Sequence, residues 1–252
     1  MGFRQKYQFW FKRAIAAGLA LFAVTAVSNA NAGTIFVSHD EWTLSNTGFA
    51  NAADTGQFVS NLVGEFGPTI HAYTNNFGFT QASLAGAMSS AGATYTTGTG
   101  FAFNLANISG FDAVFLGGFA LSAAELSDLS TYVANGGGVY LAGGTGSLGG
   151  SAAEAAAWNG FLAPFGVQMD AVFNGLSGTT MVSGDPIFDS VSALYQNNGN
   201  GLTGSSVVCC GADGLYAIHR TDAVPVSVPP TLALMGLGLV GLWFRGQRAV
   251  RG

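Results

Sequence analysis

The sequence predicts an α/β fold in which helices flank a mostly parallel sheet. Residues 113–116 and 139–142 are continuous apolar runs, without the alternation of a strand that has one face in water. Between them, Ser122 and Glu125 form the pattern of a capping box, and the glycine run 136–138 marks the end of the helix. A strand, a helix and a second strand in this order indicate a parallel crossover with both sheet faces covered.

Weaker signals on both sides extend this pattern along the chain. Apolar and β-branched runs predict further strands, and Asp54, Thr80 and Ser151 stand where helices should begin. Glycine at positions 67 and 92 should end the first two of these helices. The predicted strands are 34–38, 69–73 and 93–97, the predicted helices are 54–66, 80–92 and 151–165, the predicted turns are 75–78 and 185–186, and a closing hairpin is predicted at 207–210 and 215–218.

The amino-terminal segment 1–32 has the three parts of a secretory signal peptide. An apolar stretch at 15–27 follows a basic region, and Ala30 and Ala32 supply the small residues of a cleavage site. The basic residues are Arg4, Lys6, Lys12 and Arg13. We therefore expect signal peptidase to cut after Ala32, so that the mature chain begins at Gly33.

The carboxyl-terminal segment 224–252 reads as a single transmembrane helix with a proline spacer before it and arginines after it. The apolar run 231–244 alone is about 21 Å long at about 1.5 Å per residue, shorter than a hydrocarbon core of about 30 Å. Starting the helix at residue 226 makes it just long enough to span. Arg245, Arg248 and Arg251 should stay on the cytoplasmic side, so we expect the domain to lie on the other side of the membrane.

This tail resembles the PEP-CTERM sorting signal of Gram-negative bacteria, in the run from Val228 through Pro229 and Pro230 to Leu239 and in the arginines Arg245 and Arg248. The resemblance covers about the last 28 residues and implies handling by an exosortase-type sorting enzyme. The usual glutamate between the two prolines is absent here. An ordinary carboxyl-terminal anchor is the alternative interpretation.

The charge of the central segment differs sharply from that of the two ends. All 13 acidic residues fall within 33–223, together with one basic residue, Arg220, which gives this segment a formal charge of −12. Such a surface repels nucleic acid and anionic lipid headgroups. It favours divalent cations or neutral partners such as glycans.

The two cysteines, Cys209 and Cys210, are adjacent in the sequence. Adjacent cysteines can be bridged only with strain, so we expect no conventional disulfide framework. The pair could be redox-active, and the alternative that we favour is two small strand residues with opposite facings, one of them buried.

The central segment resembles the class I glutamine-amidotransferase-like (flavodoxin-like) domains, in runs at 121–126, 132–139, 161–167 and 185–188. The resemblance implies a nucleophilic cysteine on the turn after strand 139–142. No cysteine stands in that turn, where the candidate nucleophiles are Thr145 and Ser147, with His219 as a possible base. The glycines of the turn also fit a dinucleotide-binding pattern, but its place late in the chain favours a plain glycine turn. We expect no cofactor.

A second group of candidates follows the first predicted strand. His39, Asp40 and Glu41 should lie at the carboxyl end of the sheet, where open parallel sheets bind ligands, with His71 in or near the second strand. A divalent metal held by His39, Asp40 and His71, or a sugar hydroxyl, would fit there. In the alternative structural interpretation, Asp40 and Glu41 cap loop backbone and both histidines lie on the surface. Aromatic Trp42 and Phe49 would form a stacking platform for a sugar or a lid over the core.

These observations predict an exported protein of the envelope or extracellular matrix, anchored in the inner membrane and facing the periplasm, without enzymatic activity. Signal peptidase, an exosortase-type enzyme, the membrane and exopolysaccharide are the expected partners, and nucleic acid is not. One alternative is a secreted hydrolase acting on glycans or esters through His39, Glu41, Thr145 or Ser147. Another is a surface protein that binds divalent cations.

Overall fold

The computed structural model describes residues 33–210 and 214–221. The predicted signal peptide at 1–32 and the predicted sorting and anchor segment at 224–252 lie outside these residues. Within the described ranges, the chain has no helix with the length and hydropathy needed to cross a membrane.

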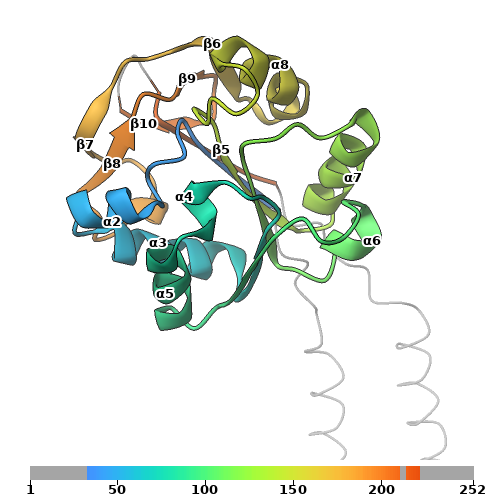
Figure 1. Ribbon diagram of the computed structural model, residues 1–252, viewed down its shortest axis with the longest axis horizontal. Coiled ribbons are helices and arrows are strands. Elements are labelled where there is room, and N and C mark those ends of the chain that lie inside the picture. The colour runs from blue at the N-terminus through green and yellow to red at the C-terminus, as the bar shows by residue number, and fades with distance from the viewer. Residues whose placement is uncertain (1–32, 211–213, 222–252) are drawn as a thin grey trace, which may run out of the picture. The chain divides into compact units, whose positions relative to one another are not determined.

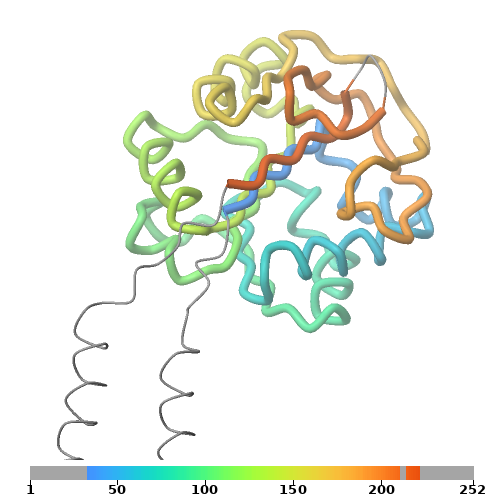
Figure 2. The backbone as a smooth tube through the Cα atoms, turned by 180° about the vertical axis from the view of Figure 1, so that it is seen from behind, coloured from blue at the N-terminus to red at the C-terminus, as the bar shows by residue number. Residues whose placement is uncertain are grey.

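A seven-stranded, mostly parallel sheet forms the centre of the domain, in the order β10-β11-β1-β5-β4-β2-β3. Five strands are parallel, and β10 and β11 are antiparallel additions beside β1. Figure 2 shows β11, in red, running beside β1, in blue. The strands are β1 (Thr34–Ser38), β2 (Thr69–Ala72), β3 (Thr94–Thr97), β4 (Ala113–Leu116), β5 (Gly138–Ala142), β10 (Val207–Cys209) and β11 (Tyr216–Arg220). The predicted α/β class is therefore confirmed.

Helices cover both faces of this sheet (Figure 1). One group consists of α2 (Asn46–Asn51), α3 (Thr55–Phe66), α4 (Phe77–Thr80) and α5 (Ala82–Ser90); the other consists of α6 (Leu105–Ile108), α7 (Ala123–Ala134) and α8 (Ser151–Leu162). Successive residues of a strand pack into two separate cores, one on each face of the sheet. Tyr140 of β5 packs with the first group of helices, and Leu141 packs with the second. Because both faces of the sheet are buried, β4 and β5 are apolar at consecutive positions and do not alternate with polar residues, as the sequence predicted.

The chain leaves neighbouring strands toward opposite faces at the border between β1 and β5 and at that between β4 and β2. After β1 it runs into α2 and α3 and after β2 into α4 and α5, whereas the central strands β4 and β5 lead to α7 and α8 on the other face. Loops that diverge in this way leave a crevice at the carboxyl ends of the strands. In this fold the loops that follow β1, β2, β4 and β5 therefore meet at one edge of the sheet.

The first and last described strands bring the two ends of the domain together. The Gly33 amide donates to the Thr221 hydroxyl at 2.7 Å, and the Thr221 amide donates to the Gly33 carbonyl at 2.8 Å. Thr34 pairs with Arg220, and the register continues to Ser38 and Tyr216. Both ends therefore leave the domain at the amino edge of β1.

Two small antiparallel ribbons were not predicted. Strand β6 (Gln168–Phe173) pairs with β9 (Asn200–Thr203), and β7 (Ser177–Met181) pairs with β8 (Ala193–Asn197). The β7 sequence, Ser-Gly-Thr-Thr-Met, has neither a buried run nor a clear alternation that would identify it as a strand. The predicted turn at Asp185 and Pro186 leads into a short 3-10 turn at Pro186–Phe188, and the predicted helix from Ser151 ends at Leu162 and continues as a 3-10 turn to Phe165.

The predicted helix starts are confirmed for α3, α7 and α8, and the start predicted for α5 is shifted by one residue. The capping box at α7 is confirmed: the Ser122 amide donates to Glu125 at 2.7 Å, and the Glu125 amide donates to the Ser122 hydroxyl at 3.4 Å. Asp54 precedes α3, but its carboxylate accepts from the Ser192 amide instead of capping the helix. Gln81, not Thr80, precedes α5, and residues 75–78 contain the start of α4, which Asn76 caps.

The interpretation of the two cysteines as unbridged strand residues was wrong, because Cys209 and Cys210 form a disulfide. Cys209 is the last residue of β10, whereas Cys210 has a φ of 86°, in the left-handed region. Because Cys210 has left the strand, the alternation of facings that a strand imposes does not apply to it.

Candidate functional site

Polar side chains from three loops and one helix meet at the carboxyl edge of the sheet. Glu41 follows β1, Asn76 follows β2, and Thr145 and Ser147 follow β5, while Glu154 lies in the first turn of α8. The Asn76 side-chain amide donates to the Glu41 carboxylate, and its carbonyl oxygen accepts from the Gly78 amide at 2.7 Å. The cap of α4 therefore fixes the orientation of the amide that holds Glu41.

Glu154 holds the loop after β5. Its Oε1 atom accepts from the Thr145 amide at 3.0 Å and also from the Thr145 hydroxyl. The Ser147 amide in turn donates to Thr145 Oγ1 at 3.3 Å. Glu154 is 1 % exposed, and its second oxygen, Oε2, has no hydrogen-bond partner among the described residues. A buried acceptor without a donor carries a free-energy cost.

Gly118, just after β4, joins the two halves of the site. Its φ is 79°, and a Cβ atom built on it would lie 3.2 Å from Asn76 Nδ2 and 3.6 Å from Ser147 Oγ. A side chain at this position would therefore crowd Asn76, and the positive φ also favours glycine here. We call the continuous set Glu41, Asn76, Gly118, Ser147, Thr145 and Glu154 the carboxyl-edge arc.

Burial and neighbouring charge raise the pKa of Glu41 to about 7. Burial is the largest cause; the hydrogen bond from Asn76 opposes it, and the negative charges of Glu154 and Asp40 add to it. The side chain is 7 % exposed. At neutral pH Glu41 is therefore present in both forms, and it can donate or accept a hydrogen bond.

Asp40 has the structural role that the alternative interpretation proposed. Its Oδ1 atom accepts from the Trp42 amide at 3.0 Å and from the Thr43 amide at 3.3 Å, and its Oδ2 atom accepts from the Asn197 amide. These bonds fix the loop after β1 and tie it to β8. The same role does not extend to Glu41, whose carboxylate pairs with a side chain.

The interpretation of His39 and His71 as surface residues was wrong, because both are buried. His39 is 0 % exposed; its Nδ1 atom lies 3.1 Å from Asn174 Nδ2 and its Nε2 atom 3.4 Å from Asp40 Oδ2. Burial lowers the pKa of His39, and the charge of Asp40 partly opposes this shift. His39 is therefore neutral at neutral pH.

The structure does not bring the three candidate metal ligands His39, Asp40 and His71 together. Strands β5 and β4 separate β1 from β2. Both ring nitrogens of His71 are engaged, with the Thr96 hydroxyl at 2.7 Å and the Gly98 carbonyl at 2.9 Å. Across residues 33–210 and 214–221, no three His, Cys, Asp or Glu side chains gather as a metal site.

His219, the predicted base for Thr145, lies at the opposite edge of the sheet. It pairs with Ile35 near the start of β1, and its Nδ1 atom lies 3.4 Å from the Ser206 hydroxyl. Since β11 runs antiparallel to β1, the end of β11 meets the amino edge. The group that contacts Thr145 is Glu154, which the sequence analysis did not single out.

An aromatic pair stands next to two arc residues in the sequence. Half-buried Trp42 and Phe77 follow Glu41 and Asn76 directly in the sequence, and their ring centroids are 4.8 Å apart with an edge-on geometry. The predicted partner of Trp42 was Phe49, which packs against the core under α3 and α5 instead.

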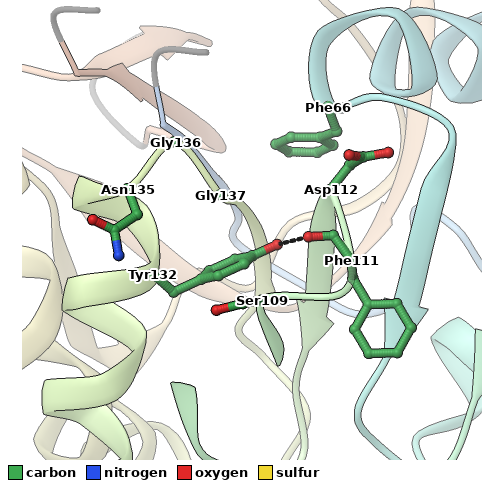
Figure 3. Close-up of a pocket in the computed structure, with 8 residues that line it drawn as sticks. All are labelled: Phe66, Ser109, Phe111, Asp112, Tyr132, Asn135, Gly136 and Gly137. Carbon is green, nitrogen blue, oxygen red and sulfur yellow. Dashed lines mark hydrogen bonds between the residues drawn. The ribbon is translucent and has the colours of Figure 1, made fainter. Parts of the chain in front are cut away.

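A cleft of about 220 Å³ lies at the other edge of the sheet and is distinct from the arc (Figure 3). Its lining holds one carboxylate, Asp112, whose Oδ2 atom accepts from the Thr69 amide at 2.8 Å. The Tyr132 hydroxyl, drawn with a dashed line, donates to the Phe111 carbonyl at 2.8 Å. The first bond joins the amino end of β2 to the segment before β4, and the second joins α7 to the same segment, so the polar groups there hold the fold together.

The fold is a mostly parallel α/β domain. At the carboxyl edge of its sheet, the arc combines acidic side chains with uncharged hydrogen-bond donors. In comparisons with protein-family models, curated proteins and solved structures, the chain has no match. Sequence reasoning found Glu41, Thr145 and Ser147 but missed Asn76, Gly118 and Glu154. Glu154 had one usable signal, since it is the single charged residue of an alanine-rich helix.

Proposed function

We propose that this protein is exported and acts in the cell envelope or the extracellular matrix, where its α/β domain binds a ligand at the carboxyl-edge arc without catalysing a reaction. The distribution of charge carries this proposal. Seven of the eight basic residues lie in the two terminal segments. The eighth, Arg220, pairs with Glu65 at 2.7 Å and with Asp185 at 2.9 Å, so the domain offers little attraction to anionic partners.

The route that we propose uses both terminal segments. Signal peptidase cuts after Ala32, and segment 224–252 holds the chain in the inner membrane with the domain in the periplasm. An exosortase-type enzyme then acts at the run Val228, Pro229 and Pro230, with Arg245 and Arg248 retained on the cytoplasmic side. The released domain would reach the surface or the exopolysaccharide matrix.

We further infer a flavodoxin-like arrangement for the sheet. The parallel strands stand in the order β3-β2-β4-β5-β1. Counted from β2, this is the flavodoxin-like order 2-1-3-4-5, with the first strand of the chain in the fifth place. In that arrangement the switch point lies between β2 and β4, beside Asn76 and Gly118, which supports a ligand site there. The amidotransferase-like resemblance gives the fold only, because Thr145 and Ser147 replace the cysteine-bearing turn.

Intact-mass measurement of the exported protein tests the route. We expect a chain that begins at Gly33 and ends between residues 228 and 231. Replacing both prolines, Pro229→Ala with Pro230→Ala, should keep the tail, whereas Pro225→Ala, outside the matched run, should not change the mass beyond the substitution itself. A mass that includes Arg251 would make the tail a plain anchor, and an unprocessed chain in the cytosol would overturn the proposal.

A hydrolase acting on glycans or esters is the second candidate, and one contact favours it. The Thr145 hydroxyl donates to the buried Glu154 carboxylate, which is the relation of a nucleophile to its base, and Glu41 with a pKa of about 7 suits an acid. For an ester, the Thr145 oxygen would attack the carbonyl carbon while its proton passes to Glu154, and the alcohol would leave with the proton of Glu41. Water would then attack the acyl carbon and lose a proton to the Glu41 carboxylate, while Glu154 would return its proton to the leaving Thr145 oxygen, which releases the acid and restores all three side chains.

Assays of the purified full chain on ester and glycan substrates test this second candidate. If it holds, Thr145→Ala should abolish turnover, Thr145→Ser should retain part of it, and Glu41→Gln should lower it about 100-fold or more. Turnover that persists in Thr145→Ala at the wild-type rate would exclude Thr145 as nucleophile.

A further inference from the structure

We propose that the bridge between Cys209 and Cys210 is a redox-active site, which a dithiol opens by two-electron exchange while the domain stays folded. Opening the bridge loosens the end of β10. This inference goes beyond the proposed function and does not depend on the carboxyl-edge arc. It gives the adjacent cysteines a reaction partner of defined chemistry and a local structural effect.

The bridge joins two neighbouring residues and therefore fastens no separate elements together. A disulfide stabilises a fold mainly by closing a loop in the unfolded chain, and this stabilisation grows with the length of the loop. Cys209 and Cys210 have a sequence separation of 1, so the loop that they close is the shortest one possible. The fold therefore loses little stability when the bond is reduced, and the domain can stay folded in both states.

The backbone at the bridge favours its opening. Adjacent Cα atoms are about 3.8 Å apart across a trans peptide, closer than the roughly 4.4 to 6.8 Å that bridged cysteines usually have, and constrained bridges are more easily reduced. Cys210 also has a φ of 86°. A residue other than glycine carries a conformational cost at such an angle, which persists only while the surrounding structure enforces it. Reduction lets Cys210 leave this conformation.

The two sulfurs differ in their access to a reductant. Cys209 is 8 % exposed and belongs to the core, whereas Cys210 is half-buried. A thiolate of the dithiol therefore attacks Cys210 Sγ, and the electron pair of the broken bond stays on Cys209 Sγ, which takes a proton. The second thiolate attacks the dithiol's own sulfur in the mixed disulfide, and Cys210 Sγ leaves with the electron pair and takes a proton. The domain gains two hydrogens, and the dithiol becomes a disulfide.

Short contacts connect the bridge to β7 and to the segment before β11. The Sγ atoms of Cys209 and Cys210 lie 4.0 and 3.6 Å from the carbonyl oxygen of Met181, the last residue of β7. The Cys209 carbonyl accepts from the Leu215 amide at 3.2 Å, and the Leu215 carbonyl accepts from the His39 amide at 2.9 Å. A thiol carries a hydrogen that it can donate to Met181, which a bridged sulfur does not. Reduction therefore changes the contacts at the end of β10, and the hydrogen bond of the Leu215 amide should weaken.

Redox titration of the detergent-purified full chain tests the inference. The chain is equilibrated with mixtures of reduced and oxidised dithiothreitol, its thiols are alkylated with iodoacetamide, and the intact mass is measured. We expect the pair to open without denaturant and without a change in circular dichroism. Hydrogen exchange should become about tenfold or more faster at the Leu215 amide. It should not change at the Thr69 amide, which donates to Asp112 at the other edge of the sheet.

Two substitutions of Cys210 separate the effect of the bridge from that of the backbone. Cys210→Gly removes the bridge, but glycine adopts a positive φ without cost, so exchange at Leu215 should stay near that of the oxidised protein. Cys210→Ser removes the bridge and keeps the cost, so exchange should match that of the reduced protein. Neither variant should respond to dithiothreitol at the Leu215 amide.

Three results would each overturn the inference. The first is that the thiols appear only in denaturant or together with a loss of circular dichroism. The second is that the Leu215 amide exchanges at the same rate in the oxidised and the reduced wild type. The third is that Cys210→Gly exchanges at this amide as fast as Cys210→Ser, or faster. The first two results need no variant, so the inference stays testable if a substitution prevents folding.

Discussion

Glu41→Gln should raise the free energy of unfolding by roughly 2 to 3 kcal/mol at pH 8 and change it little at pH 4. The pKa of Glu41 is about 7 in the folded protein and 4.5 ordinarily. Between these two values the unfolded chain loses its proton while the folded chain keeps it, so the stability of the wild type falls as the pH rises. Glutamine carries no such penalty and can still accept from Asn76.

Urea unfolding of wild type and variant at pH 4 and pH 8 measures this difference. The lowered pKa values of His39 and His71 destabilise the fold in acid, but they are common to both proteins and cancel. Asp189→Asn should give a small change that is the same at both pH values. If the gain from Glu41→Gln did not depend on pH, the environment that we describe for Glu41 would be wrong.

Trp158→Ala should lower the free energy of unfolding by roughly 3 to 5 kcal/mol. Trp158 lies in α8, is 1 % exposed, and belongs to the core formed with α7 and the sheet. Its ring contacts that of Phe119 at 6.5 Å in an edge-on geometry. The truncation leaves a cavity that the packed helices cannot close. Glu154 lies one helical turn earlier, so the loop after β5 should also lose order.

Thermal and urea unfolding at fixed pH test this expectation, and Trp158→Phe is the matched variant, with an expected loss well below that of alanine. Hydrogen exchange at the Thr145 amide gives a local readout, because this amide donates to Glu154. A loss below about 1 kcal/mol for Trp158→Ala would mean that α8 does not pack on the sheet as described.

The parts of the fold that sequence predicted well are those governed by local rules. The buried runs of β4 and β5 and the capping box of α7 each depend on residues within a few positions of one another. Strands β7 and β8 escaped prediction because polar residues such as Thr179 and Thr180 form a strand only when a partner strand is present.

The site was predicted in part for a similar reason. Glu41 and Thr145 follow recognisable strands, and the carboxyl ends of parallel strands meet at one edge. The partner of Thr145 depends on strand order and direction, which no local pattern specifies. His219 was the natural base by residue type, but the antiparallel direction of β11 carries it away from Thr145. Glu154 reaches Thr145 because α8 starts at that edge.

The hydrogen bonds between Gly33 and Thr221 hold both ends of the domain at the edge of the sheet that lies opposite the arc. A tether joined to either residue would attach beside the first residue of β1. This point is one strand length away from Glu41, which follows the last residue of β1. Such attachment leaves the loops after β1, β2, β4 and β5 unobstructed, because they lie at the opposite edge of the sheet. A fusion partner or a solid support coupled at position 221 should therefore leave ligand capture intact, whereas coupling through the loop at Ser147 should block it.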